Sequence, residues 1–191
     1  MRRFQLKIWF VIFFFISAGI YPQQVDIPVK IQYPLALKIL SFERALKKRI
    51  GKKLTIGIAY QEKFRGSRNI AEELQTQIAN NFKIKIHGVP VTSVLINLDK
   101  TSIENALSST DINILYVTPL RVINIQNIQK IARQKNILTL TGVSDYVEDG
   151  IMVGIGLKGG KPNIIINLKE AKTIGADFSS KLLKFSTIID I

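Results

Sequence analysis

Strand-like and helix-like segments alternate through the middle of the chain, and this alternation limits the fold more than any other feature. The segment 53–61 alternates like a strand, and the segment 66–82 then repeats apolar residues at every fourth position, as a helix does. The same order continues, with strands expected at 83–98, broken at 88–90, at 111–119 and at 136–143, and helices at 101–107 and 122–135. Because strands joined by helices lie parallel, the pattern predicts an α/β three-layer sandwich with a mostly parallel central sheet and helices on both faces.

Proline and capping residues indicate where the first two helices begin. Pro28 and Pro34 interrupt the segment before residue 34, so we expect an extended lead-in there. Pro34 suits the first turn of a helix, and apolar spacing predicts that this helix covers 34–50. Ser67 is a candidate N-cap for the helix that follows the first strand.

The N-terminus has the layout of a secretory signal peptide. Basic residues precede an apolar run at 8–18, and Ser17 and Gly19 supply small residues at the −3 and −1 positions of a cleavage site. The run is shorter than the ~20 apolar residues of a membrane-spanning helix, which favours a cleaved signal peptide over a retained anchor. We expect a signal peptide at 1–19, with cleavage as late as residue 24. One domain at 25–191 would then remain, with no integral membrane segment.

The chain is strongly basic, with a formal net charge of +13. Loss of Arg2, Arg3 and Lys7 with the signal peptide would lower it by three, to +10. In an exported protein this charge favours an anionic membrane face, an acidic partner or solubility over nucleic acid. The densest cluster, at 47–53, coincides with an expected helix end, where cations suit the dipole. It therefore favours a solvated helix end over an anion-binding site.

Few residues are available for catalysis or metal binding. The chain has no cysteine, which excludes disulfides, thiol catalysis and cysteine-ligated metals, and its one histidine is His87. His87 lies beside a glycine at a strand end, which favours a structural or surface role over a catalytic triad. Asp145, Glu148 and Asp149 cluster without the spacing of a calcium loop, so a solvated turn is favoured there. We expect no catalytic residue, cofactor or metal ion.

The segment 154–159 has the glycine spacing G-x-G-x-x-G of a dinucleotide-binding motif. That motif requires a helix after the glycines, but a strand-like run at 163–167 follows Pro162 instead. We therefore interpret the segment as a C-terminal β-hairpin with its turn at 158–161. Gly154 and Gly156 lie on one face of its first strand, where glycine allows another element to approach closely.

The last quarter of the chain resembles the C-terminal signature of the YfiR family. The matching positions include a glycine–methionine step, an Ile-Asn-Leu strand end and a Ser-Ser-x-Leu-Leu end, and they are Gly150, Met152, Gly154, Ile166, Asn167, Leu168, Ala171, Gly175, Ser179, Ser180, Leu182 and Leu183. Looser counterparts of the family's first helix and of two strands lie at 35–42, 56–58 and 113–117. The resemblance covers 34–188, and we interpret the signature positions as structural.

The resemblance implies a small periplasmic regulator that is not an enzyme. Members of the family restrain a membrane-bound diguanylate cyclase by binding its periplasmic sensor domain, which lowers cyclic-di-GMP and biofilm formation. Other members lie beside membrane sensors such as histidine kinases, and members tend to form homodimers. This chain departs from the family in having no cysteine, so redox control through disulfides cannot apply to it. Arg44-Ala45-Leu46 also replaces the family's aromatic end of the first helix.

Two other classes of function stay open. The alternating α/β core is also that of a periplasmic small-ligand receptor resembling half of a solute-binding protein, since such sheets place ligands at the carboxyl ends of their strands. A secreted hydrolase would require an organised set of serine, histidine and aspartate side chains, and no serine lies in a G-x-S-x-G setting.

Overall fold

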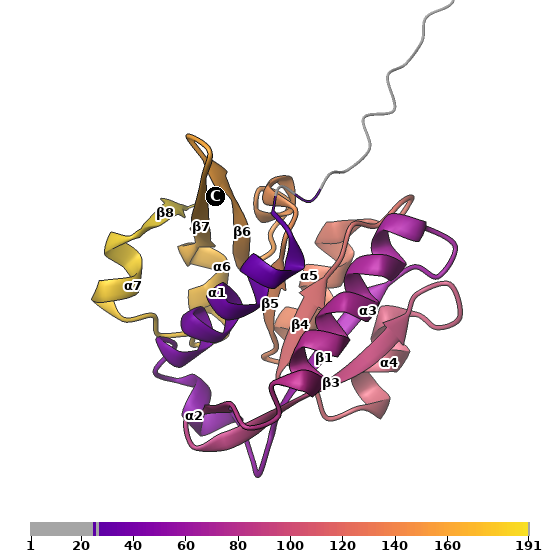
Figure 1. Ribbon diagram of the computed structural model, residues 1–191, viewed down its shortest axis with the longest axis horizontal. Coiled ribbons are helices and arrows are strands. Elements are labelled where there is room, and N and C mark those ends of the chain that lie inside the picture. The colour runs from indigo at the N-terminus through magenta and orange to yellow at the C-terminus, as the bar shows by residue number, and fades with distance from the viewer. Residues whose placement is uncertain (1–24, 26, 191) are drawn as a thin grey trace, which may run out of the picture.

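An eight-stranded sheet forms the centre of the molecule (Figure 1). The computed structural model describes Val25 and residues 27–190 of the 191-residue chain. The strand order is β2-β3-β1-β4-β5-β6-β7-β8. The bounds are β1 (Leu54–Tyr60), β2 (Lys85–Ile86), β3 (Val89–Asn97), β4 (Ile114–Val117), β5 (Leu138–Thr141), β6 (Val153–Lys158), β7 (Lys161–Asn167) and β8 (Ser186–Ile189).

Most of the sheet is parallel, as the alternation predicted. The neighbours from β3 through β1, β4 and β5 to β6 are all parallel, and β8 is parallel to β7. Antiparallel pairing occurs between β2 and β3 and between β6 and β7. Each antiparallel pair is a hairpin, whereas helices supply the crossovers that parallel strands need.

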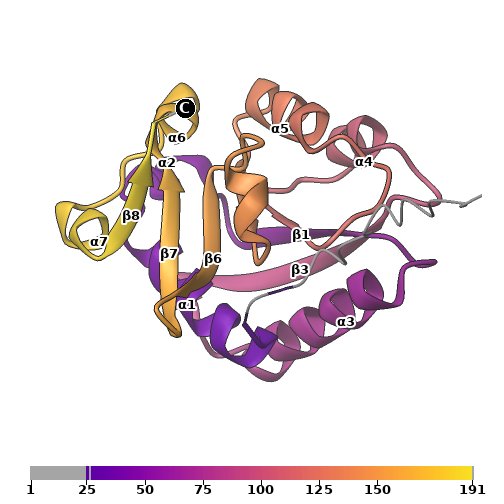
Figure 2. The ribbon, with the colours of Figure 1, turned by 90° about the horizontal axis from the view of Figure 1, so that it is seen from above.

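Helices cover both faces of the sheet, which confirms the three-layer α/β sandwich (Figure 2). Helices α1 (Val29–Ser41) and α3 (Arg65–Asn80) pack on one face, where α3 buries Ala71, Leu74 and Ile78 in the larger core. Helices α4 (Ile103–Ser109) and α5 (Ile125–Gln134) cover the other face, where α5 buries Ile125, Ile128 and Ile131, as their spacing predicted. Every residue of β1 is buried, because the strand is central and covered on both sides.

The first helix begins earlier and ends earlier than its apolar spacing predicted. The expected extended lead-in is wrong for residues 29–33, because α1 begins at Val29 after Pro28, and Pro34 lies inside the helix. Val29 and Tyr33 are buried in the core, so tertiary packing offsets the hydrogen bond that Pro34 cannot make. The chain then leaves the helix after Ser41 and forms the short α2 (Leu46–Arg49).

The N-terminal signal peptide expected at 1–19, with its cleavage range to 24, lies outside the described residues. Within Val25 and residues 27–190, none of the helices has both the length and the apolar character needed to cross a bilayer.

The C-terminal quarter begins with the predicted hairpin. Strands β6 and β7 pair from Val153↔Ile166 to Lys158↔Lys161, and Gly159 and Gly160 have φ values of +57° and +73° between them. Both central residues of the turn thus have positive φ, which suits Gly-Gly. A strand follows the glycines where a dinucleotide site needs a helix, so the nucleotide motif has no structural counterpart here.

Short elements surround this hairpin in the fold. The 3₁₀-helix η1 (Ser144–Val147) precedes it, and α6 (Leu168–Thr173), α7 (Ser180–Lys184) and β8 follow it. Of these, η1 contacts β5, β6 and β7, α6 contacts β7 and β8, and α7 contacts β8.

Candidate functional site

The carboxyl ends of the parallel strands meet at a reversal of strand order. β1 lies between β3 and β4, so the crossover from β1 to β3 runs to one side and the crossover from β3 to β4 runs back past β1 to the other side. In open α/β sheets ligands bind beyond the carboxyl ends of the strands at such a reversal. We call the residues beyond the ends of β1, β3 and β4, namely 61–68, 98–103 and 118–128, the carboxyl edge.

Two hydroxyl groups at the carboxyl edge, those of Ser67 and Thr118, bond to each other. The predicted N-cap role of Ser67 is wrong, because α3 begins at Arg65 after Phe64. The buried Ser67 Oγ instead accepts a hydrogen bond from Gln61 N at 2.9 Å and lies 2.6 Å from Thr118 Oγ1. Thr118 Oγ1 donates to Ala59 O at 2.9 Å, so the Ser67 hydroxyl donates to Thr118. Both hydroxyl hydrogens are therefore used within the protein.

Gln61 and Arg121 hold the loop after β4 against the start of α3. Gln61 Oε1 accepts a hydrogen bond from Arg121 N at 2.6 Å. The Arg121 guanidinium carbon lies 4.1 Å from the centroid of the Phe64 ring, a cation–π contact. The loop is thus held through both the backbone N–H and the side chain of Arg121.

Val122 is strained and exposed in this well-held loop. Its φ is +58° and its side chain is fully exposed. A β-branched residue is rarely left-handed, and such strain costs on the order of 1–3 kcal/mol and clusters at functional sites. Nothing in the pattern of the sequence signals this conformation, because valine usually favours extended backbone.

Two shallow hollows are lined by Ile123 and Asn124, the residues that follow Val122 in the chain. One, of about 200 Å³, separates the starts of α4 and α5 and is lined by residues including Ser102, Ile103, Asn124 and Ile128. The other, of about 350 Å³, is lined by Ile123, Asn124, Ile125, Gln126, Tyr146 and Asp149. Ser102 and Asn124 each cap a helix with their side-chain oxygen, so these oxygens already accept backbone hydrogen bonds.

The signature positions supply turns, caps and core contacts near the C-terminus. Gly150 and Gly175 have φ values of +104° and +68°, and Asn167 and Ser179 cap α6 and α7. Met152, Gly154, Ile166, Ala171 and Leu182 are buried, Leu168 and Leu183 are half-buried, and Ser180 is exposed.

Gly154 lies where another element approaches the sheet closely. A Cβ atom at Gly154 would overlap the Val147 side chain of η1. Gly156 is also buried in β6. The close approach expected on this face of the strand is therefore present at Gly154.

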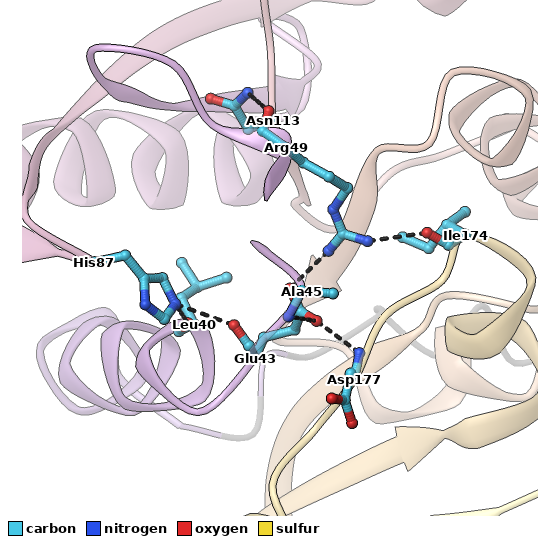
Figure 3. A network of polar contacts seen from close by, with 8 residues as sticks. All are labelled: Leu40, Glu43, Ala45, Arg49, His87, Asn113, Ile174 and Asp177. Carbon is cyan, nitrogen blue, oxygen red and sulfur yellow. Dashed lines mark hydrogen bonds and ion pairs between the residues drawn. The ribbon is translucent and has the colours of Figure 1, made fainter. Parts of the chain in front are cut away.

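A polar network centred on Glu43 ties the N-terminal helices to the C-terminal segment (Figure 3). The buried Glu43 carboxylate accepts from Ala45 N at 3.1 Å and from Asp177 N at 2.6 Å, and it forms an ion pair of 2.7 Å with Arg49. Arg49 Nη1 also donates to Ile174 O at 3.0 Å. The network explains why the helix breaks after Ser41: the chain must turn there to meet residues 174–179.

His87 belongs to the same network and has a structural role. It lies at the turn between β2 and β3 with a φ of +49°. Its Nε2 is 3.1 Å from Leu40 O and 3.0 Å from Glu43 O. Because both partners are carbonyl oxygens, Nε2 carries the hydrogen and donates. His87 thus fastens the hairpin to the end of α1, as the structural interpretation expected.

Sequence reasoning assigned Arg49 to a solvated cluster, and this assignment is wrong for Arg49 alone. Lys47, Lys48, Lys52 and Lys53 are exposed, whereas the Arg49 side chain is 18% exposed. Burial lowers the pKa of the Arg49 guanidinium, and the Glu43 carboxylate opposes that shift. The one feature of the sequence that could have indicated this burial is the presence of an arginine among lysines, because arginine suits buried positions with several hydrogen bonds better than lysine does.

The acidic cluster does not form a metal site. Asp145 lies in η1, and Glu148 and Asp149 follow it directly. Across the described part of the chain, no group of three histidine, aspartate or glutamate side chains could hold a metal ion.

Comparison with known families shows the family to which the chain belongs. A family model described as YfiR/HmsC-like matches residues 52–187. The chain belongs to the YfiR/HmsC-like family. Membership of this family points to a periplasmic regulator of diguanylate cyclase signalling. No curated protein matches the chain in sequence.

Solved structures with the same fold include a substrate-binding protein. A conserved domain protein from Vibrio cholerae has a TM-score of 0.59 at 16% identity over 85% of this chain and 60% of its own. The ligand-free, open form of a substrate-binding protein with adhesive properties from Clostridium difficile has a TM-score of 0.54 at 19% identity. The match covers 76% of this chain and 57% of that structure. The ABC domain in complex with L-Trp from Streptococcus pneumonia has a TM-score of 0.57 at 15% identity. The match covers 81% of this chain and 62% of that structure. These likenesses show the fold, and the chain spans about three fifths of each of these structures.

Proposed function

We propose that this protein is exported to the periplasm, where it binds the periplasmic sensor domain of a membrane-bound diguanylate cyclase and restrains the enzyme. The observation that carries the proposal is the match of residues 52–187 to the YfiR/HmsC-like family. The basic and apolar segments of residues 1–19 support export. A histidine kinase sensor is the alternative partner, and the protein itself forms a homodimer in this proposal.

The Ser67 and Thr118 hydroxyls at the carboxyl edge and the His87 side chain at the β2–β3 turn are not arranged for catalysis. The Ser67 and Thr118 hydroxyls bond within the protein, and His87 Nε2 donates to two carbonyl oxygens. Neither arrangement supplies the nucleophile and base of a hydrolase. We therefore assign the protein a regulatory role without catalysis.

We place the sensor-binding surface at the carboxyl edge, around Val122. Its side chain is fully exposed, although its strained backbone is held by the Arg121 contacts with Gln61 and Phe64. Strain that is retained without any packing gain is expected where a function needs that geometry. An exposed apolar side chain, followed in the chain by residues that line two shallow hollows, suits a protein partner.

Co-purification from envelope extracts tests this proposal. The tagged protein should recover a membrane sensor, and Val122→Glu should reduce that recovery without changing the thermal midpoint. Phe185→Glu is a matched control, because Phe185 is 76% exposed but lies beyond α7 at the other end of the sheet. Deleting the gene should raise cyclic-di-GMP. Recovery of no sensor, or an unchanged cyclic-di-GMP level, would contradict the proposal.

A periplasmic small-ligand receptor is the second candidate. The observation that favours it is the shared fold with a substrate-binding protein and with a domain solved in complex with L-Trp. The hollow of about 350 Å³ lies at the low end of the ~300–1,000 Å³ typical of ligand sites. The Asn124 side-chain oxygen already caps α5 and is not available to a ligand, so we rank the receptor below the regulator.

Thermal shift against a library of small metabolites separates the two candidates. A rise of several degrees in the midpoint with one metabolite, lost in Gln126→Ala at the larger hollow, would favour the receptor. Absence of any shift, together with recovery of a sensor, would favour the regulator.

A further inference from the structure

The outer edge of β3 is open along most of its length. On the side away from β1, the described residues place only β2 next to β3, with the pairs Ile86↔Val89 and Lys85↔Pro90. No strand pairs with that side of β3 from Val91 to Asn97 in the described part of the chain.

The backbone groups on this edge point outward at alternate residues. Leu98 N donates to Tyr60 O of β1 at 2.8 Å, so even-numbered residues of β3 direct their backbone groups toward β1. The N–H and C=O groups of Val91, Ser93 and Leu95 therefore face away from the sheet. A row of such groups is a ready template for another strand.

The open edge lacks the usual protection against pairing. The residues from Val91 to Asn97 are Val-Thr-Ser-Val-Leu-Ile-Asn, without charge, glycine or proline. Natural edge strands are usually interrupted by lysine, proline or a bulge. Elsewhere the chain is rich in charge, with 27 lysine and arginine residues and 14 aspartate and glutamate residues. Two copies of so basic a protein repel one another, and a contact through this uncharged strand adds no further charge repulsion.

The open stretch of β3 is limited at both ends, and a second copy of the same stretch can pair with it in an antiparallel register. β2 blocks it before Val91, and the chain turns away after Asn97, whose carbonyl oxygen accepts from Lys100 N and Thr101 N at 3.1 Å. An antiparallel copy centred on Val94 would set Val91 opposite Asn97 and Ser93 opposite Leu95. In this register Ser93 and Leu95 of the two copies exchange backbone hydrogen bonds in both directions, and the two Val94 residues form a close, non-hydrogen-bonded pair.

An apolar groove lies beside the same edge. It is lined by Ile78, Ala79 and Phe82 from α3 and its end and by Val91, Thr92 and Ser93 from β3. Phe82 is 67% exposed at this groove. A copy that places Leu95 opposite Ser93 brings an apolar side chain next to the groove and covers apolar surface that is otherwise in water.

We propose that β3 pairs antiparallel with β3 of a second copy about a two-fold axis at Val94, joining the two sheets into one. A self-complementary strand is what a two-fold interface requires, because the same patch meets itself. The proposal supplies an interface for the homodimer included in the proposed function. Its test uses no sensor protein, so failure of the dimer would leave the restraint of a diguanylate cyclase standing.

The absence of native cysteine allows a direct test by cross-linking. Val94→Cys should form a disulfide-linked dimer under mild oxidation, because the two positions face each other at the axis. Thr92→Cys is the matched control on the same face of the same strand. In the proposed register the two Thr92 residues are roughly 13 Å apart, beyond the ~7 Å limit between Cα atoms for a disulfide.

Sedimentation of the purified protein completes the test. The unmodified chain should have the mass of two chains, and Ser93→Lys, which adds two charges at the interface, should give one chain that still unfolds in a single cooperative transition. Its thermal midpoint should no longer depend on protein concentration, since only the dimer gains stability by association. A single-chain mass for the unmodified protein at high micromolar concentration would overturn the proposal. So would a dimer that persists in Ser93→Lys, or cross-linking of Thr92→Cys as complete as that of Val94→Cys.

Discussion

The Glu43 carboxylate and the Arg49 guanidinium form an ion pair of 2.7 Å between groups that are 0% and 18% exposed. Glu43 also accepts the backbone N–H of Asp177, so one side chain joins the end of α1, the start of α2 and the segment before α7. One carboxylate thus joins two neighbouring helices to a segment that lies 134 residues away in the sequence.

Replacing Glu43 should therefore destabilise the protein strongly. Glu43→Ala leaves Arg49 without its partner and Asp177 N without an acceptor, and removal of one partner of a buried pair costs about 3–5 kcal/mol. Urea unfolding measures this loss. Arg44→Ala is the control, because the Arg44–Asp177 pair lies at the same junction with side chains 61% and 51% exposed. Exposed pairs contribute little, so similar losses in both variants would contradict a special role for Glu43.

Gly154→Ala should lower stability by about 1–3 kcal/mol, the usual cost of overpacking. The added methyl group would overlap the Val147 side chain, and either η1 or β6 would have to move. Gly51→Ala is a matched control, because nothing lies within 4 Å of its added Cβ. Thermal unfolding of the two variants makes the comparison. An unchanged midpoint in Gly154→Ala would refute the close-packing role.

Val122→Gly should stabilise the protein by about 1 kcal/mol while weakening capture of the sensor. Glycine adopts a φ of +58° without strain, and the exposed valine side chain loses no packing when it is removed. Val122→Ala retains a Cβ and should gain less stability. Paired measurements of unfolding free energy and sensor recovery test both halves. A lower stability in Val122→Gly would mean that the loop is not strained.

Stability should fall as the pH rises above about 10, the ordinary pKa of tyrosine. Burial raises the pKa of Tyr116, whose hydroxyl donates to Gln32 Oε1. Burial also raises the pKa values of Tyr33, Tyr60 and Tyr146. Above pH ~10 the unfolded chain loses these protons and the folded protein keeps them, so unfolding is favoured increasingly with pH.

Tyr116→Phe separates this effect from general alkaline damage. The variant should be less stable at neutral pH, because Gln32 loses a donor, but its stability should decline less steeply above pH ~10. Urea midpoints at several pH values, with tyrosinate absorbance as a second signal, provide the measurement. An identical pH dependence in both proteins would show that Tyr116 ionises normally.

Local patterns predicted the parts of the fold that depend on neighbouring residues. The burial of Ile125, Ile128 and Ile131 follows from helical spacing, and Gly159-Gly160 suits the positive φ values of the hairpin turn. The strand after Pro162 was enough to reject a nucleotide site, because the missing helix is a local feature. Family membership was also recognised from the C-terminal residues, and the family match confirms it.

Helix ends and site contacts could not be predicted because their causes lie far away in the sequence. Ser67 resembles an N-cap by its position, but Thr118 from another loop bonds to its hydroxyl. The end of α1 depends on Asp177, whose backbone N–H donates to the Glu43 carboxylate from 134 residues away in the sequence. Helical periodicity continues past Ser41 and carries no trace of that contact.

The sequence alone determined the alternating α/β architecture, the hairpin and the family, because period, turn chemistry and signature residues act over a few positions. Tertiary structure alone decided the burial of Arg49, the left-handed Val122 and the open edge of β3. All three depend on which distant segments the folded sheet brings together. Local sequence patterns carry no information about such contacts or about which strand is left at an edge of the sheet.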